Sequence, residues 1–149
     1  MKIQQILKKI VKHVILFITG GGIYYLIEFL YKTFISLSPC HWSMFLLGGF
    51  CFVLIGLLNE TFDWDMPLLE QGLIGSILIT SCELVFGYIL NIHLGLGIWD
   101  YSNVPLNFLG QICLPFSLLW ILISIGAVIL DDYLRYKWFD EEKPHYKLI

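Results

Sequence analysis

Charged residues are scarce in this chain. Asp, Glu, Lys and Arg make up 14% of its 149 residues, whereas 58% are hydrophobic and 16% are aromatic. Because soluble domains carry about 25% charged residues, this composition excludes an ordinary water-soluble fold. The chain also lacks a basic patch interleaved with aromatic residues, which excludes a nucleic-acid-binding protein. The composition predicts a protein embedded in the lipid bilayer.

The motifs of metal, disulfide and nucleotide sites are also missing. No CxxC pair occurs among the four cysteines, which are Cys40, Cys51, Cys82 and Cys113. The chain contains no GxxxxGK[ST] phosphate loop. Cys40 and His41 are adjacent, so their side chains point apart and give no nucleophile–base geometry. We therefore expect no metal site, no cofactor and no catalytic residues.

Long apolar runs are what the chain does have. A transmembrane helix needs roughly 20 apolar residues. Clusters of Pro, Asn and Asp separate the expected spans, which run approximately over 13–34, 42–59, 68–91 and 104–130. Asn103, ahead of Pro105, is typical of a helix N-cap and marks the start of the last span. The sequence predicts an all-α integral membrane protein with four transmembrane helices in a single domain, 1–149.

Basic residues gather at the two ends of the chain. They are Lys2, Lys8, Lys9 and Lys12 before the first span, and Arg135, Lys137, Lys143 and Lys147 after the last. Lys32 alone lies between these groups. The positive-inside rule then places both termini in the cytoplasm and the protein in the cell membrane, with 36–41 and 92–103 as outer loops.

The two tails have the character of interface elements. Residues 1–12 combine an apolar stripe with lysines, as expected of an amphipathic helix on an anionic cytoplasmic leaflet. In the cytoplasmic tail, 131–149, Asp131 and Arg135 form an i,i+4 pair on a helical extension. We interpret this extension as a solvated helix end, with docking of a cytoplasmic partner as the alternative.

Two glutamates, Glu28 and Glu83, lie deep inside expected spans. A carboxylate there costs on the order of 2.5–3.5 kcal/mol, so it usually faces a protein interior or a watery cavity. Lys32 lies four residues after Glu28, the favourable order for a helical ion pair. Glu83 has no cation within a turn of its own segment and is the better candidate for binding a proton or cation. The alternative is that Glu83 hydrogen-bonds across a packed helix seam.

Small and polar residues form a stripe along the third span. At steps of three and four residues it comprises Gly72, Ser76, Thr80, Glu83, Gly87 and Asn91, and in the fourth span Gly110, Ser117 and Ser124 recur every seven. Such residues let helices approach closely in lipid. The order of parts around Glu28 and Glu83 also suggests a parallel repeat of two spans each, which would make these glutamates equivalent.

A polar route through the membrane would use the few polar residues inside or beside the spans. As its lining we predict Glu83, Glu28, Lys32, Asn107 and Gln111. As its outer mouth we predict His41, Trp42, Trp99, Asp100 and Tyr101. For the aromatic members of the mouth, anchoring at the membrane interface is the simpler alternative.

Several runs of residues resemble a known family. They are GGIYYLIE at 21–28, HWSMFLLGG at 41–49, GLLNE at 56–60 and, most specifically, WDYSNVPLNFLGQIC at 99–113. The chain resembles the "putative ABC-transporter type IV" family, also called CmpB-like. The resemblance implies a transport role in which a separate ATPase subunit hydrolyses ATP, because this chain has no phosphate loop. Four spans are few for a permease half, which favours a homo-oligomer if a pore exists.

Three classes of function remain open. The first is a small transporter or permease subunit with a polar path through the membrane. The second is a membrane scaffold or regulator that transports nothing. The third is a membrane-embedded enzyme acting on a lipid or isoprenoid-linked substrate, with Glu83, His41 or Asp100 in acid–base roles. Solute flux in proteoliposomes separates the first class from the other two.

Overall fold

The computed structural model describes residues 2–62 and 66–148 of the chain. Within these residues, four helical segments are long and apolar enough to cross a membrane, namely Ile3–Ser36, Ser43–Thr61, Leu68–His93 and Leu114–Phe139. This confirms the prediction of an all-α integral membrane protein.

The first two segments are built from α1 (Lys2–Tyr31) with a π-helical turn η1 (Lys32–Ser36), followed by α2 (Ser43–Gly56) and the short α3 (Leu58–Thr61). The last two are built from α4 (Leu68–Gly87) with a π-helical turn η2 (Tyr88–His93), and from α5 (Leu114–Phe139). Between them, β1 (Asn107–Phe108) pairs with β2 (Ile112–Cys113) in an antiparallel hairpin.

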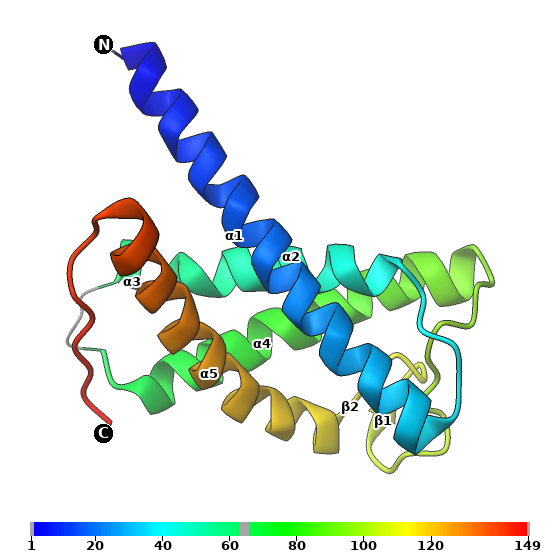
Figure 1. Ribbon diagram of the computed structural model, residues 1–149. Coiled ribbons are helices and arrows are strands. Elements are labelled where there is room, and N and C mark those ends of the chain that lie inside the picture. The colour runs from blue at the N-terminus through cyan, green and yellow to red at the C-terminus, as the bar shows by residue number, and fades with distance from the viewer. Residues whose placement is uncertain (1, 63–65, 149) are drawn as a thin grey trace.

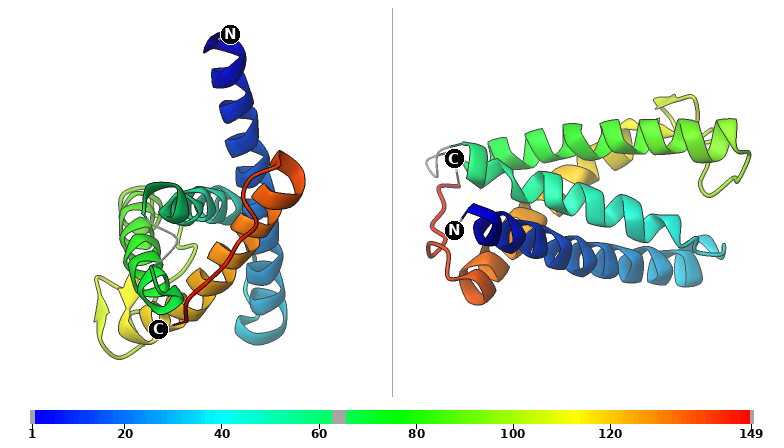
Figure 2. Two further views of the ribbon diagram at one scale, coloured as in Figure 1. Left: turned by 90° about the vertical axis from the view of Figure 1, so that its left-hand side faces the viewer. Right: turned by 90° about the horizontal axis from the view of Figure 1, so that it is seen from above.

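Both termini lie at one end of the helix bundle, which we call the terminal end (Figures 1 and 2). The connections 37–42 and 94–113 lie at the opposite end, the loop end. An even number of spans requires the termini to be on the same side of a membrane, and the observed arrangement meets this requirement. The placement of that side in the cytoplasm stays a prediction from the lysine pattern.

The fourth span begins later than predicted. Helix α5 starts at Leu114, not at 104, and Cys113 rather than Asn103 is its N-cap residue. Residues 104–113 cannot continue the helix because Leu106, Leu109 and Gly110 all have positive φ angles of 56°, 54° and 67°. At its other end α5 continues to Phe139, in agreement with the helical extension expected around Asp131 and Arg135.

Helix α1 runs without interruption from Lys2 to Tyr31. The amphipathic segment predicted over 1–12 therefore continues directly into the first span. Its first turns extend away from the other helices at the terminal end (Figures 1 and 2).

Glycines allow the helices of each consecutive pair to approach closely. A Cβ atom at Gly49 of α2 would lie 2.7 Å from the backbone oxygen of Phe17 in α1. In α4, a Cβ atom at Gly75 would lie 2.5 Å from the Ser124 side chain of α5. Because there is no hydrophobic force between helices in lipid, such close packing is a main source of their association.

Replacing Gly49 by alanine should separate α1 from α2. The new methyl group meets backbone, which cannot rotate away, so we expect a loss of about 1–3 kcal/mol. Thermal unfolding in detergent measures this. Gly22→Ala is the matched control, because a Cβ atom at Gly22 would meet nothing within 4 Å. Equal melting temperatures for the two variants would contradict this account of the α1–α2 contact.

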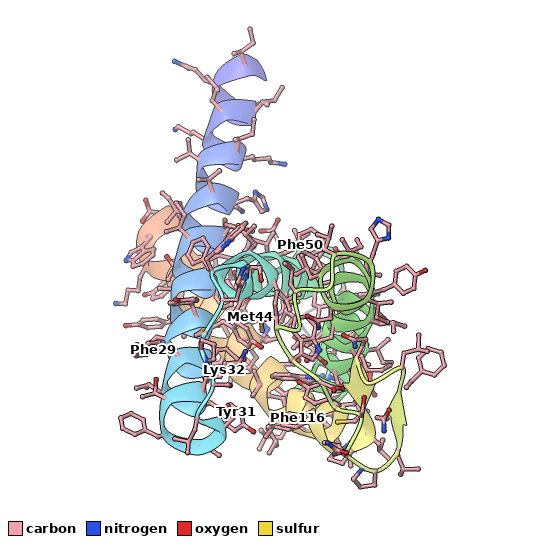
Figure 3. The ribbon with its side chains drawn as sticks, turned by 90° about the vertical axis from the view of Figure 1, so that its right-hand side faces the viewer. Phe29, Tyr31, Lys32, Met44, Phe50 and Phe116 are labelled. Atoms are coloured by element: carbon pink, nitrogen blue, oxygen red, sulfur yellow. The ribbon has the colours of Figure 1, made fainter. Side chains whose placement is uncertain are left out.

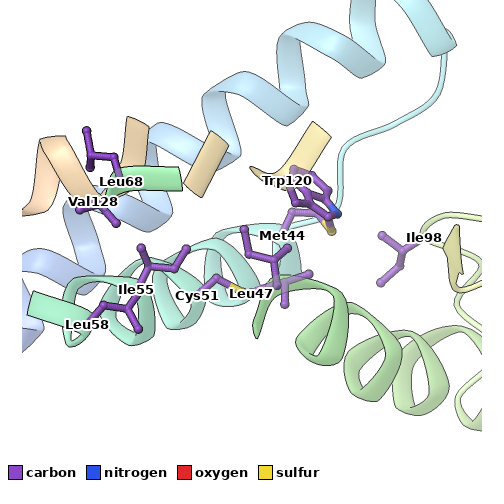
Figure 4. Close-up of a cluster of buried hydrophobic side chains, with 10 residues drawn as sticks. Met44, Leu47, Cys51, Ile55, Leu58, Leu68, Ile98, Trp120 and Val128 are labelled. Carbon is purple, nitrogen blue, oxygen red and sulfur yellow. The ribbon is translucent and has the colours of Figure 1, made fainter. Parts of the chain in front are cut away.

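The core lies along α2, which contributes Met44, Leu47, Cys51 and Ile55 to one buried cluster, and Leu58 of α3 extends this cluster (Figure 4). Trp120 and Val128 of α5 pack into the same cluster. Helix α2 is thus the element around which the other helices pack. Helices α1 and α5 leave space between them, and the candidate site lies there.

Candidate functional site

Glu83 of α4 is buried with 4% of its surface exposed. Its Oε2 atom accepts a hydrogen bond from Trp120 Nε1 at 2.8 Å, and its Oε1 atom accepts one from the Tyr101 hydroxyl at 3.4 Å. Burial, followed by the charge of Glu83, raises the pKa of Tyr101, so this phenol keeps the proton that it donates. Glu83 is therefore bonded across the α4–α5 seam, as the alternative interpretation predicted.

Glu28 and Lys32 form the predicted i,i+4 ion pair, with 3.4 Å between Lys32 Nζ and Glu28 Oε1. Lys32 is 4% exposed, and its ammonium also donates to the backbone oxygen of Ile98 at 2.7 Å. In Figure 3, Lys32 and Tyr31 point toward Phe116 of α5, whereas Phe29 points away from the bundle. The ion pair therefore also ties α1 to the 94–113 loop.

An apolar cavity of about 300 Å³ lies between α1, α2, α4 and α5. Most of its lining is apolar, as at Ile79 and Ile123, and it reaches Leu130 toward the terminal end. Glu83 and Trp120 bring the polar atoms of their hydrogen bond to its wall. We call this space the apolar cavity.

A charged cavity of about 310 Å³ adjoins it at the loop end. Tyr24, Ile27, Trp120 and Ile123 line both cavities, so the two cavities lie next to each other between α1 and α5. The charged cavity is additionally lined by Glu28, Lys32, Ser36, Ser38, Asp100 and Tyr101, among others. Ligand sites in proteins typically have volumes of about 300–1,000 Å³, and each cavity reaches that range.

Asp100 supplies an exposed carboxylate to the charged cavity. Its Oδ1 atom accepts hydrogen bonds from the Ser102 hydroxyl at 2.5 Å and from the Ser102 backbone N–H at 2.8 Å. These bonds lower the pKa of Asp100 below its usual value, so the carboxylate is charged at neutral pH.

The structure brings six of the predicted site residues to this space, namely Glu28, Lys32, Glu83, Trp99, Asp100 and Tyr101. His41 instead accepts the backbone N–H of Ser43 at 3.2 Å and so satisfies a free amide at the start of α2. Trp42, 65% exposed, packs against the His41 ring at a centroid distance of 5.4 Å.

Asn107 and Gln111 hold the 94–113 loop together. Asn107 donates to the backbone oxygen of Val104 at 2.8 Å and accepts from the Gly110 N–H at 3.1 Å. Gln111, 5% exposed, accepts from Asn91 of η2 at 2.8 Å through Oε1. Residues 99–113, which carry the family resemblance, thus form a hydrogen-bonded loop over the loop end of the bundle. We call this loop the cap.

Replacing Gly110 by alanine should break this cap. A Cβ atom there would lie 2.5 Å from Ser102 Oγ and 2.7 Å from Asp100 Oδ1, on a backbone with φ of 67°. Gly95→Ala is the matched control, because Gly95 has φ of 66° but nothing within 4 Å of its Cβ position. Backbone strain alone costs about 1–2 kcal/mol.

We expect Gly110→Ala to be less stable than Gly95→Ala by about 1–3 kcal/mol, the usual penalty for overpacking. Thermal unfolding and hydrogen exchange over 94–113 measure the difference. Equal exchange rates in the two variants would show that the cap does not depend on this contact.

The polar stripe predicted along the third span packs against α5. Ser76 Oγ donates to the Ser117 backbone oxygen at 2.5 Å, and Thr80 Oγ1 donates to Ser117 Oγ at 3.0 Å. These hydrogen bonds, and the close approach of Gly75 to Ser124, hold α4 against α5. Polar contacts of this kind stabilise helix pairs in lipid.

A charged cluster at the terminal end was not predicted as a unit. Arg135 Nε donates to Asp131 Oδ2, and Arg135 Nη1 donates to Glu60 Oε1 at 2.5 Å. Lys12 of α1 binds both Glu60, at 3.0 Å, and Glu141, at 2.6 Å. Asp131 is 0% exposed and Arg135 is 3% exposed, so the interpretation of this pair as a solvated helix end was wrong.

The C-terminal segment closes over this cluster. The Tyr146 hydroxyl donates to Asp132 Oδ2 at 2.9 Å, and the backbone N–H of Leu68 donates to the Lys147 backbone oxygen at 2.8 Å. Burial, followed by the charge of Asp132, raises the pKa of Tyr146, which therefore remains a donor. The i,i+4 spacing revealed the Asp131–Arg135 pair, but the contacts with Lys12 and Glu60 span too much sequence to be inferred from spacing.

Comparison with curated proteins and with solved structures found no match. A family model described as "Putative ABC-transporter type IV" does match, over residues 15–139. The match includes α2 to α5, most of α1 and every cavity-lining residue named above. This membrane protein therefore belongs to the "Putative ABC-transporter type IV" family.

Proposed function

We propose that this chain is the substrate-binding membrane subunit of a transporter, with ATP hydrolysed by a separate subunit. The observation that carries the proposal is the pair of adjoining cavities between α1 and α5, one lined by charged residues and the other reaching Glu83. Buried carboxyl groups in membrane spans typically mark substrate or ion pathways. The family description supports a link to ABC transporters.

The two ends of the bundle differ in a way that fits alternating access. At the loop end, the charged cavity is bordered by exposed residues such as Ser36, Ser38 and Asp100. At the terminal end, Arg135 and Lys12 join α5, α1, Glu60 and Glu141 through ion pairs. We propose that the structure represents the state open at the loop end and closed at the terminal end.

The proposal predicts that Glu83→Gln transports poorly while remaining folded, because glutamine keeps an acceptor for Trp120 but loses the ionisable carboxyl group. The lost interaction is the one between the Glu83 carboxyl group and the substrate. A hydrogen bond to a charged group is worth about 1.5–3 kcal/mol, so flux should fall about tenfold or more. Native mass spectrometry of the gently purified complex identifies the bound solute and any ATPase. Flux of that solute is then measured in proteoliposomes, with and without the ATPase.

The control is Glu70→Gln, which removes an exposed carboxylate from the first turn of α4 and should leave flux unchanged. Equal flux in the Glu83→Gln and wild-type proteins would contradict the proposal. Stable association with a partner but no flux under either condition would favour the scaffold alternative. Turnover of a labelled lipid by the purified protein would favour the enzyme alternative.

A further inference from the structure

We infer that the space between α1 and α5 binds a single-chain amphipathic amine. Its alkyl chain would occupy the apolar cavity, and its ammonium group would lie in the charged cavity near Glu28 and Asp100. This inference rests on the proposed function, because it names the class of substrate for the same site. Two observations support this inference. They are the excess of acidic over basic residues in the charged cavity and the apolar lining of the neighbouring cavity.

The charged cavity has more acidic than basic groups in its lining. Glu28 and Asp100 contribute carboxyl groups, whereas Lys32 is the basic residue among those that line it. The Lys32 ammonium is buried and already bonded to Glu28 and to the backbone oxygen of Ile98. Because Lys32 compensates Glu28, the Asp100 carboxylate leaves the lining with a net negative charge, which an ammonium group complements whereas a carboxylate or phosphate is repelled.

Hydroxyl groups add acceptors for the N–H donors of an amine. Ser36 and Ser38 line the charged cavity, and their Oγ atoms are 2.7 Å apart. A primary ammonium has three donors, so one carboxylate and two hydroxyl oxygens could satisfy it.

The apolar cavity fits the other end of such a molecule. Beyond the four shared residues its wall is formed mostly by aliphatic side chains and glycines, from Gly20 of α1 to Leu130 of α5. Burial of an alkyl chain there is favourable by roughly 0.8 kcal/mol per methylene removed from water. Two-chain aminophospholipids fit less well, because the phosphate next to their amine would face Glu28 and Asp100.

A photoreactive long-chain primary amine, with a diazirine in its alkyl chain, tests the inference in nanodiscs. Mass spectrometry should locate the label on half-buried α1 and α5 residues that line the apolar cavity, such as Tyr24 and Ile123. Dodecylamine should compete at least tenfold better than dodecanol, dodecanoate or phosphatidylethanolamine. Labelling spread evenly over lipid-facing residues, or equal competition by dodecanol, would overturn the inference.

Charge-removing variants identify the head-group contacts. Glu28→Gln and Asp100→Asn should each weaken competition by dodecylamine roughly tenfold, whereas Glu70→Gln should not change it. Asp100→Asn keeps the Oδ1 acceptor for Ser102 and lies on the surface, so it remains informative if Glu28→Gln does not fold. Unchanged competition in Asp100→Asn and in folded Glu28→Gln would overturn the assignment of the head group.

The experiment separates this inference from the proposed function. Specific amine labelling without amine flux in the complete complex would support the ligand class and contradict transport. Flux of a different solute that depends on Glu83, without amine labelling, would support transport and overturn the ligand class.

Discussion

Arg135→Ala should lower the free energy of unfolding by about 3–5 kcal/mol, which is the usual cost of removing one partner from a buried ion pair. Asp131, 0% exposed, would be left as a buried carboxylate without the cation that binds it. Glu60 would lose one of its two cations and retain Lys12. Chemical and thermal unfolding in detergent measure the effect.

Lys137→Ala is the control for Arg135→Ala. Lys137 lies two residues further along α5, is exposed, and has its ammonium 5.3 Å from the centre of the Tyr136 ring. Removing an exposed charge of this kind should cost less than about 1 kcal/mol. An Arg135→Ala variant as stable as Lys137→Ala would contradict the role of Arg135 at the terminal end.

A double variant tests the pairing itself. If Arg135 mainly compensates Asp131, the combination of Arg135→Ala and Asp131→Asn should be more stable than Arg135→Ala alone. Groups in direct contact typically show coupling energies of about 0.5–3 kcal/mol. Strictly additive losses would show that Asp131 is compensated by another group.

Trp120→Phe should destabilise the protein by about 2–3 kcal/mol. The substitution keeps an aromatic ring in the core but removes the indole N–H that donates to Glu83 at 2.8 Å. Leaving a buried acceptor without its donor costs about 1–3 kcal/mol. The hydrogen bond from the Tyr101 hydroxyl, at 3.4 Å, is the longer and weaker of the two that this carboxyl group accepts.

Thermal unfolding of Trp120→Phe measures this effect, and Trp42→Phe provides the matched control. Trp42 is 65% exposed at the loop end, so its replacement should change stability by less than about 0.5 kcal/mol. Equal melting temperatures for the two variants would mean that the Trp120–Glu83 bond contributes nothing measurable.

Local spacing predicted much of what the structure contains. The Glu28–Lys32 pair and the stripe from Gly72 to Asn91 follow from helical periodicity, because residues three or four apart lie on one face. The four spans follow from hydrophobicity and length. These features depend on residues that are close in sequence, and so the chain reveals them without knowledge of its fold.

Features built from distant segments could not be predicted in this way. Residues 104–113 are apolar enough to resemble the start of a span, but their positive φ angles and the bonds of Asn107 form a hairpin. Lys12 and Glu60 meet only after α1 and α2 have packed. The predicted equivalence of Glu28 and Glu83 stays a prediction, although their partners differ: Lys32 for one, Trp120 and Tyr101 for the other.

The central claim is that substrate occupies the space between α1 and α5. Gly126 of α5 lines the apolar cavity, and a Cβ atom there would meet nothing within 4 Å, so a large side chain can enter the cavity without a clash at its first atom. The decisive measurement is flux of the co-purified solute through Gly126→Phe, with Gly22→Phe as a control in comparably open space on α1. We predict that Gly126→Phe loses flux at least tenfold with an unchanged melting temperature, while Gly22→Phe transports normally. Wild-type flux through a folded Gly126→Phe protein would contradict the account.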